Sequence, residues 1–487
     1  MDLIETLAKA QVVAAQQREV EGQIVAKRVL SNATRHEPMG LEETLVTVDF
    51  TDFNHKDDYT RWYVLDERNE AKLVPGLLSK HLQERHPSMT LGGAVHVYRN
   101  GVYCELTESA AAKVVMDHIY TSKVRTSQIK DVLNLWQIVT NTVPDSVNDS
   151  PMLINLKNGI YDIKTKNLKY HNPSFKSTQQ IRASYVPGAT IVRFAQYLDE
   201  VLPKDSQILA QEIMGYIISG LNRAKKAFIL MGISNSGKSV LINLVEMLIG
   251  EDNCSHVPWQ NLSERFNVAL LYGKLLNSFA DLPATALKDT GVFKTLTGGS
   301  DRMMAERKGK DAFKFTNRAR FLFSCNKLPR IYGDQTAIDR LVILKFSTTI
   351  PEEKRIDLMP VFEKELDGIL LWALEGLHRL INNNFVFSNA SDSISITEDY
   401  KKSCSPVLVF IDEMCVIESN ASCKTSELHA TYSRWCEING FHRMSIRAFI
   451  DELESNFELD RYKHPKTRQS HLIGIGLVAG TEFDDFI

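Results

Sequence analysis

The sequence lacks the features that mark membrane-inserted and secreted proteins. No run of eighteen apolar residues occurs among its 487 residues. The N-terminal residues MDLIETLAKA carry acidic side chains where a signal peptide would carry basic ones. Seven cysteines are present, but none of them forms a CxxC pair. These absences predict a cytoplasmic protein with no membrane partner.

The sequence also lacks a zinc motif and a strong net charge. Four cysteines lie near two histidines in the C-terminal quarter, but their spacings match no common ligand pattern, so buried free thiols are the better interpretation. These residues are Cys404, Cys415, Cys423, Cys436, His429 and His442. The net charge of -3 is uninformative, so basic residues that bind nucleic acid must be clustered locally.

One stretch, AFILMGISNSGKSVLINLVEMLIG at residues 227–250, combines an apolar run, a glycine-bracketed loop and a second apolar run. The loop has the spacing at which backbone N–H groups surround a phosphate chain. We interpret the flanking runs as a strand and a helix, an order that disfavours the alternative of a glycine-rich surface turn. The predicted nucleotide-binding residues are Gly232, Ser234, Asn235, Ser236, Gly237, Lys238, Ser239 and Val240.

Two side chains of this loop are predicted to act directly on the nucleotide. Lys238 would reach the β- and γ-phosphates, and Ser239 would place its hydroxyl on a metal ion. The start of the following helix would add the positive end of its dipole. The loop therefore predicts ATP and Mg²⁺ as the bound cofactors.

Further polar residues follow predicted strands downstream of the loop. The strand 275–279 delivers Asp281, whose carboxylate could hold Mg²⁺ or orient the attacking water. Next come Lys294 and the pair Gly298-Gly299, and then two alternating strands that meet at 308–310 and predict a hairpin with a cationic tip. Asn326 ends the next apolar run, and Arg340 directly precedes another.

This order of motifs resembles the superfamily 3 helicases, and more closely the phage and plasmid primase-helicase family, which is related to the poxvirus primase-helicase. The resemblance covers about residues 150–480. It implies an AAA+ ATPase that forms a ring, usually a hexamer. It also implies roles for individual residues: Lys238 and Ser239 for nucleotide and Mg²⁺, Asp281 for the second acidic motif, Lys308 and Lys310 for DNA, Asn326 for γ-phosphate sensing, and Arg340 for the neighbouring subunit's ATP.

The sequence departs from the family pattern at one position and leaves a choice at another. Many members carry two adjacent acids where this chain has Ala280 and Asp281, so Glu306 and Asp301 are possible substitutes for orienting the water, although each is more often a structural carboxylate. Arg330 competes with Arg340 as the arginine that reaches the neighbouring subunit, and we favour Arg340.

Four regions are predicted along the chain: a helical extension over 1–60, a helical and hairpin domain over 61–190, the ATPase domain over 191–385 and a winged-helix domain over 386–487. A long amphipathic helix is expected within residues 2–30, and hairpins are expected at Asn100-Gly101, at Asn158-Gly159 and near residues 164–167. A polar linker is expected after Asn382, followed in the winged-helix domain by helices over 426–440 and 445–457 and by two strands around a polar loop over 457–478. The basic residues Arg461, Lys463, Lys466 and Arg468 fall in the expected wing, where they could contact DNA or form a solvated charge run.

The N-terminal acids Asp49, Asp52, Asp57 and Asp58 could hold the two metals of a primase, but we interpret them as surface acids and expect no primase activity. The predicted fold class is α/β, with an AAA+ P-loop ATPase core, a mostly helical N-terminal region and a C-terminal winged helix. The predicted function is an ATP-dependent, ring-forming replicative DNA helicase of a phage, plasmid or other mobile element in a bacterial host. The alternative is an ATP-regulated, origin-binding replication initiator that does not itself unwind processively, and a packaging or RNA-directed motor is disfavoured.

Overall fold

The computed structural model describes residues 59–478, apart from 69, 120–123, 286, 288–289, 300, 310, 332–333 and 464–467. Within these residues the chain divides into two compact units, one of 59–149 with 172–178 and the other of 150–171 with 179–478. The helix expected within 2–30, the acids between Asp49 and Asp58, and the bases Lys310 and Lys466 lie outside the described residues. No helix among the described residues is long and apolar enough to span a membrane.

The first unit consists of three helices, a two-stranded ribbon and a three-stranded antiparallel sheet around a core that contains Trp62 and Trp136. The hairpin predicted at Asn100-Gly101 is confirmed, and both turn residues have the positive φ that a two-residue turn of this kind requires, 47° and 90°. The elements are β1 (Tyr63–Leu65), β2 (Ala71–Leu73), α2 (Pro75–Arg85), β3 (Ser88–Leu91), β4 (Ala94–Arg99), β5 (Val102–Glu105), α3 (Glu108–Asp117) and α4 (Thr126–Val139).

The second unit begins with a small antiparallel sheet of β6 (Leu153–Leu156), β7 (Gly159–Asp162) and β8 (Asn167–Lys169). Its two turns lie at residues 157–158 and 163–166, each one residue before the position predicted from Asn158-Gly159 and residues 164–167. A side chain at Gly159 would lie 2.5 Å from the carbonyl oxygen of Lys169, so glycine is required by the close approach of β8. Tyr161 of this sheet contacts His378 through a 2.9 Å hydrogen bond.

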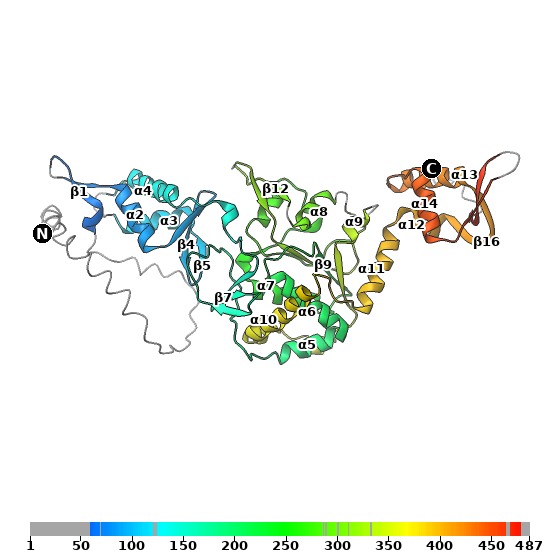
Figure 1. Cartoon of the computed structure of the whole chain (residues 1–487), viewed down its shortest axis with the longest axis horizontal. Coiled ribbons are helices and arrows are strands. Elements are labelled where there is room, and N and C mark those ends of the chain that lie inside the picture. Colours follow the sequence, from blue (N-terminus) through cyan, green and yellow to red (C-terminus); the bar gives the residue numbers. More distant parts are fainter. Residues whose placement is uncertain are drawn as a thin grey trace. The chain divides into compact units, whose positions relative to one another are not determined.

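A five-stranded parallel sheet forms the centre of the second unit (Figure 1). Its order is β10 (Cys254–Ser255), β11 (Leu276–Phe279), β14 (Arg320–Cys325), β9 (Ala227–Gly232) and β15 (Leu341–Phe346). Alternate residues of β9 enter different cores, Phe228 and Leu230 on one face and Ala227 and Ile229 on the other. The sheet is therefore buried on both faces, which explains why β9 appears in the sequence as an uninterrupted apolar run.

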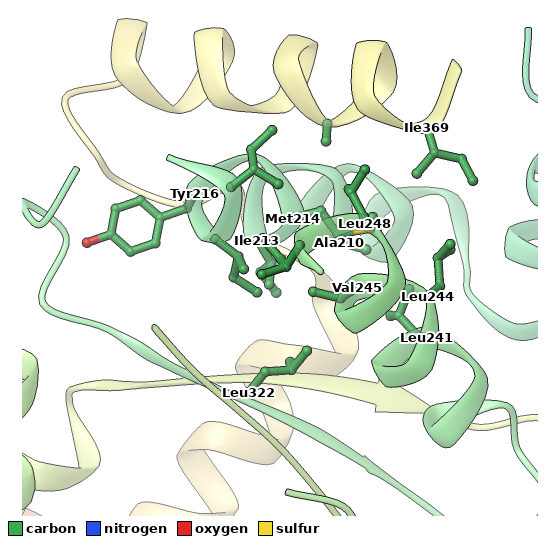
Figure 2. Close-up of a cluster of buried hydrophobic side chains, with 14 of the residues drawn as sticks. Ala210, Ile213, Met214, Tyr216, Leu241, Leu244, Val245, Leu248, Leu322 and Ile369 are labelled. Carbon is green, nitrogen blue, oxygen red and sulfur yellow. The ribbon is translucent and has the colours of Figure 1, made fainter. Parts of the chain in front are cut away.

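Four helices cover one face of the sheet: α5 (Arg193–Val201), α6 (Lys204–Ile218), α7 (Lys238–Ile249) and α10 (Met359–Asn382). Figure 2 shows side chains of α6 and α7 meeting Leu322 of β14 below and Ile369 of α10 above. Helices α6 and α10 touch through their backbones, because a Cβ at Gly376 would lie 2.2 Å from the Gln211 carbonyl oxygen. The same pair is joined by Arg379, which donates at 2.7 Å to the fully buried carboxylate of Glu212.

The other face is covered by α8 (Gly291–Gly298), α9 (Gln335–Ile338) and α11 (Ser391–Cys404), with η6 (Trp259–Asn261) and η7 (Asn267–Leu271). The predicted basic hairpin is present as β12 (Arg302–Ala305) and β13 (Phe313–Thr316), paired antiparallel. Helix α11 was not expected in the polar segment after Asn382. It contributes Tyr400 and Cys404 to the core beneath the sheet.

The chain ends in α12 (Pro406–Met414), β16 (Cys415–Lys424), α13 (Thr425–Asn439), α14 (Ile446–Asn456), β17 (Asp460–Lys463) and β18 (Ser470–Leu477). The three strands form one antiparallel sheet in the order β16-β18-β17. Phe410, Tyr432 and Phe449 share its core. The predicted helices α13 and α14 and strands β17 and β18 are confirmed, whereas α12 and β16 were not predicted.

Candidate nucleotide-binding site

The candidate phosphate loop joins β9, an interior strand of the sheet, to α7, and its glycines are fixed by the residues that pack against them. Gly237 has a φ of 95°, and a Cβ there would lie 3.0 Å from Val201 of α5. The Tyr197 hydroxyl donates to the Gly237 carbonyl oxygen at 2.9 Å. A Cβ at Gly232 would lie 2.3 Å from the Phe346 carbonyl oxygen. The glycine spacing is therefore required by neighbouring elements as well as by any bound phosphate.

Lys238 lies at the centre of this loop, only 5% exposed. Its Nζ donates to the carbonyl oxygens of Gly232 and Ile233, each at 2.7 Å, and to the Asn326 Oδ1 at 3.1 Å. Burial lowers the pKa of Lys238, and the negative charge of Asp281 acts in the opposite direction. An ammonium surrounded only by acceptors can exchange one of them for a phosphate oxygen and keep its own N–H groups paired.

Asp281 follows β11 and Asn326 follows β14, two strands on the same side of β9, so the structure brings both toward Lys238. Asp281 has a φ of 54°, an uncommon value for a residue other than glycine, and its N–H donates to the Ser324 hydroxyl at 3.1 Å. Asn326 contacts Lys238 directly and also donates to the Ser234 hydroxyl at 3.4 Å. The three predicted residues thus meet at the carboxyl ends of parallel strands, where open α/β sheets bind ligands.

The donors at this edge suit a nucleotide with a divalent metal ion. Ser234, Asn235 and Ser239 are exposed, as is Asp281, while Ser236 and Gly237 are buried and Val240 is half-buried. The Ser239 hydroxyl and the Asp281 carboxylate are oxygen ligands of the kind that Mg²⁺ prefers. Helix α7 begins at Lys238 and directs its unpaired N–H groups toward the same edge.

Arg340 is not brought to this site. It directly precedes β15, whose first residue Leu341 pairs with Ala227, while Phe346 pairs with Gly232 beside the loop. With about 3.3 Å per residue, Arg340 is about 17 Å or more from the loop along the strands. Its Nη1 donates instead to the Thr297 hydroxyl at 2.7 Å and to the Lys294 carbonyl oxygen. Arg330, the alternative, follows β14, and its carbonyl oxygen accepts from the Leu287 N–H at 2.9 Å.

The two acids considered as substitutes for the water-orienting residue have other surroundings. Glu306 accepts two hydrogen bonds from Arg265, at 2.8 and 2.9 Å. The Asp301 carboxylate lies so close to Gly298 that a Cβ there would be 2.5 Å from it. Both acids therefore lie at the base of the hairpin and contact the residues next to it.

The β12–β13 hairpin carries exposed bases and is held by residues that sequence reasoning missed. Lys308 is exposed near its tip. Arg307 lies over the rings of Tyr272 and Phe313, at 5.7 and 5.6 Å. Arg265 and Tyr272 come from the segment RFNVALLYGK, whose apolar residues have neither a helical nor a strand period. The only signal in its sequence is that each base lies close to an aromatic residue.

The described bases of the C-terminal sheet are exposed, namely Arg461, Lys463 and Arg468. Arg461 is engaged by Glu454 of α14, with Nη2 to Oε2 at 2.7 Å. A DNA phosphate would therefore have to compete with the Glu454 carboxylate for the guanidinium of Arg461.

Comparisons with known proteins give matches along most of the chain. Residues 48–203 match a family described as D5 N terminal like, residues 230–340 match a Family of unknown function (DUF5906), and residues 403–473 match one described as Poxvirus D5 protein-like. The first match reaches upstream of residue 150, where the resemblance seen in the sequence begins.

Two curated viral proteins named as helicases are similar to the chain. It is 24% identical over 247 residues to 184R of Invertebrate iridescent virus 6, covering 47% of this chain and 25% of that protein. It is 26% identical over 222 residues to 121R of Invertebrate iridescent virus 3, covering 42% and 24%. The chain thus spans about a quarter of the length of these relatives. Among solved structures, the apo NrS-1 C-terminal region is 14% identical, with a TM-score of 0.48, over 83% of this chain and 100% of that one.

Proposed function

We propose that the chain belongs to a D5-like primase-helicase family and that it is an ATP-dependent, ring-forming replicative DNA helicase of a phage, plasmid or other mobile element. The observation that carries the proposal is the convergence of Lys238, Asp281 and Asn326 at one edge of the parallel sheet. A cation, an acid and an amide in this arrangement suit phosphoryl transfer, which depends on positioning and charge stabilisation.

Each of these residues has a distinct part in the proposed hydrolysis. Lys238 pairs with the β- and γ-phosphates of ATP, after giving up one of its present carbonyl acceptors. Asn326, within 3.1 Å of that lysine, contacts the γ-phosphate and detects its departure. Ser239 and Asp281 would hold Mg²⁺, which neutralises charge on the phosphates when bound. Asp281 also orients the attacking water.

A second subunit is needed to complete the site. The register of β9 and β15 places Arg340 at the opposite end of the strands from its own loop. An arginine in this position cannot reach the ATP of its own subunit, so its contribution to charge stabilisation requires a neighbour. Such an arginine accelerates phosphoryl transfer by about 10³ to 10⁵ in other NTPases. This geometry supports a ring, and we propose a hexamer.

DNA is the proposed polymer partner, bound at two places. The cationic tip of the β12–β13 hairpin suits contacts to the phosphates of a single strand. The C-terminal order helix, strand, helix, helix, strand, strand, with β18 between its partners, supports a winged helix that docks duplex. The bases of β17 and the following segment would contact its backbone.

The rival is an origin-binding initiator that uses ATP to assemble while another helicase unwinds. Purified full-length chain, given ATP and Mg²⁺, should displace the strand of a duplex with a 3′ or 5′ tail. Displacement of neither tail, together with nucleotide-dependent binding to duplex, would favour the initiator.

The loop assignment is tested by Lys238→Ala, which removes one cation from a preformed loop. We expect ATPase activity and unwinding to fall at least about 100-fold while the oligomeric state remains that of wild type. Lys204→Ala is the matched control, because this lysine is 78% exposed and far along the chain from the loop. Normal ATPase turnover of the Lys238 variant would overturn the assignment.

A further inference from the structure

Within the part of the chain that the structure describes, the guanidinium of Arg340 is held through one nitrogen, Nη1. Nη1 donates to the Thr297 hydroxyl at 2.7 Å and to the carbonyl oxygen of Lys294, both in α8. The Thr297 hydroxyl, 4% exposed, donates its own proton to the Phe293 carbonyl oxygen at 2.8 Å. Its orientation is therefore fixed, and an oxygen lone pair remains for Arg340.

The other edge of the same guanidinium is not engaged. Among the residues that the structure describes, Nε and Nη2 of Arg340 make no hydrogen bond or ion pair, and the side chain is half-buried rather than enclosed. A guanidinium presents its N–H groups as a rigid planar fork, and two parallel N–H groups match two oxygens of a phosphate. Holding Nη1 therefore determines the direction in which the remaining edge points.

The backbone before Arg340 is attached to the same helix. Asp334 accepts from Lys294 Nζ at 2.7 Å and from the Thr290 hydroxyl, and its second oxygen caps α9 through the Ala337 N–H at 3.1 Å. Burial raises the pKa of the Asp334 carboxyl, but the hydrogen bonds from Lys294, Thr290 and Ala337 outweigh it and leave the pKa below its usual value. The segment from Asp334 to Arg340 is thus anchored to α8 at both ends.

We propose that Thr297 is a positioning residue for Arg340, holding Nη1 so that the Nε and Nη2 edge meets the γ-phosphate bound by the neighbouring subunit. The inference rests on the proposed function, since it requires an arginine that acts between subunits. Thr297 touches neither nucleotide nor DNA in this role. Because α8 runs directly into Gly298-Gly299 and the hairpin, the same contact joins the arginine to the element proposed to bind DNA.

Two substitutions isolate the hydroxyl. Thr297→Val keeps the branched shape and removes the acceptor, whereas Thr297→Ser keeps the acceptor. We expect the valine variant to lose about 10- to 100-fold in kcat for DNA-stimulated ATP hydrolysis, with KM for ATP unchanged, because a misdirected group acts in the transition state. The serine variant should retain most of the wild-type kcat. Thr297→Ala, which introduces no new bulk, replaces the valine variant if that protein does not assemble.

Mixing experiments separate positioning from a general structural defect. Lys238→Ala subunits cannot use ATP themselves but still offer an intact Arg340. Adding them to Thr297→Val protein should restore part of the hydrolysis, as it should for Arg340→Ala. Wild-type kcat in the valine variant, or a loss that mixing does not restore, would overturn the role of Thr297. If Arg340→Ala itself keeps full activity, Arg340 does not act between subunits. In that case the proposed mechanism is wrong, and not only the role of Thr297.

Discussion

Single side chains in the first unit show how burial sets protonation. The pKa of His86 is lowered from 6.5 to about 4, first by burial and then by the nearby charges of His118 and Arg85. The imidazole is therefore neutral in the folded unit at pH values where it would be protonated in an unfolded chain. Protons bind preferentially to the unfolded state between these two pKa values.

The expected result is a loss of stability of this unit as the pH falls from 6.5 toward about 4, with the contribution of His86 fully present above pH 6.5. His86→Gln removes the titrating group and should flatten the dependence of the unfolding midpoint on pH in this window. Thermal unfolding of both proteins at pH 7, 6, 5 and 4.5 measures it. An unchanged slope in the variant would contradict the assignment.

The site residues at strand ends could be predicted from the sequence, but the residues that hydrogen-bond to the site and hold it in place could not. Lys238, Asp281 and Asn326 each follow an apolar run, and parallel strands bring their carboxyl ends together. Tyr197 beneath the loop and Thr297 beside Arg340 lie 40 and 43 residues from their partners, on helices whose packing no local pattern specifies. Nucleotide roles for the strand-end residues stay predictions until hydrolysis is measured.

Among the helices, the contact between α6 and α10 depends on glycine. A Cβ at Gly376 would meet the backbone of Gln211 at 2.2 Å, and one at Gly215 would meet the backbone of Ala373 at 2.3 Å. Backbone atoms cannot swing aside as a flexible side chain can, so a methyl group at either position must push the helices apart.

Gly376→Ala should therefore lower the stability of the second unit by about 1–3 kcal/mol despite the better helix propensity of alanine. Gly76→Ala is the control, because nothing lies within 4 Å of a Cβ at that helical position. It should be neutral or stabilising by up to about 1 kcal/mol. Unfolding midpoints in urea measure the stability of both variants. Equal changes in stability would show that α6 and α10 can move apart without a loss of stability.

Element prediction succeeded where turn chemistry or an apolar period was present. The Asn-Gly pairs marked both hairpins: Asn100 and Gly101 have the positive φ that a two-residue turn needs, whereas the second turn is formed by Lys157 and Asn158, with Gly159 already paired in β7. Strand β16 was missed, since residues 418–420 are polar and exposed and its register shifts between Ile417 and Ser422. Helix α11 was missed because SDSISITEDYKKSC has little apolar period, and its packing against β15 comes from tertiary contacts.

At the scale of the whole molecule, two sets of bases should have separate tasks. Lys308 belongs to a hairpin within the ATPase segment, so nucleotide can change its position, and Lys310 is two residues further along the chain, whereas Arg461 and Lys463 belong to the C-terminal sheet. Replacing both hairpin lysines with alanine should nearly abolish unwinding, and each lost phosphate contact should reduce the single-strand salt slope by about 0.7. Replacing Arg461 and Lys463 should weaken duplex binding and leave single-strand-stimulated ATPase largely unchanged.

Unwinding and binding assays over a range of salt concentrations test this division. A hairpin double variant that unwinds at the wild-type rate under saturating DNA would reverse this division, because mass action cannot replace a contact that drives movement.

The predicted domain boundaries, the AAA+ core and the winged helix stay predictions. Sequence patterns identify segments, but how far each segment packs with the next depends on contacts between distant residues.

The interior position of β9 in the sheet has a consequence for biosynthesis. Both of its neighbours, β14 and β15, come later in the chain, and more than 110 residues separate Gly232 from its partner Phe346. At common translation rates the ribosome needs about 10 s to make that length. Until β14 is complete at Cys325, more than 90 residues after Gly232, the apolar strand AFILMG has neither partner. The first strand of the sheet to be made is the last to be enclosed, and nascent chains halted before residue 346 would expose a segment that chaperones bind and that aggregates readily.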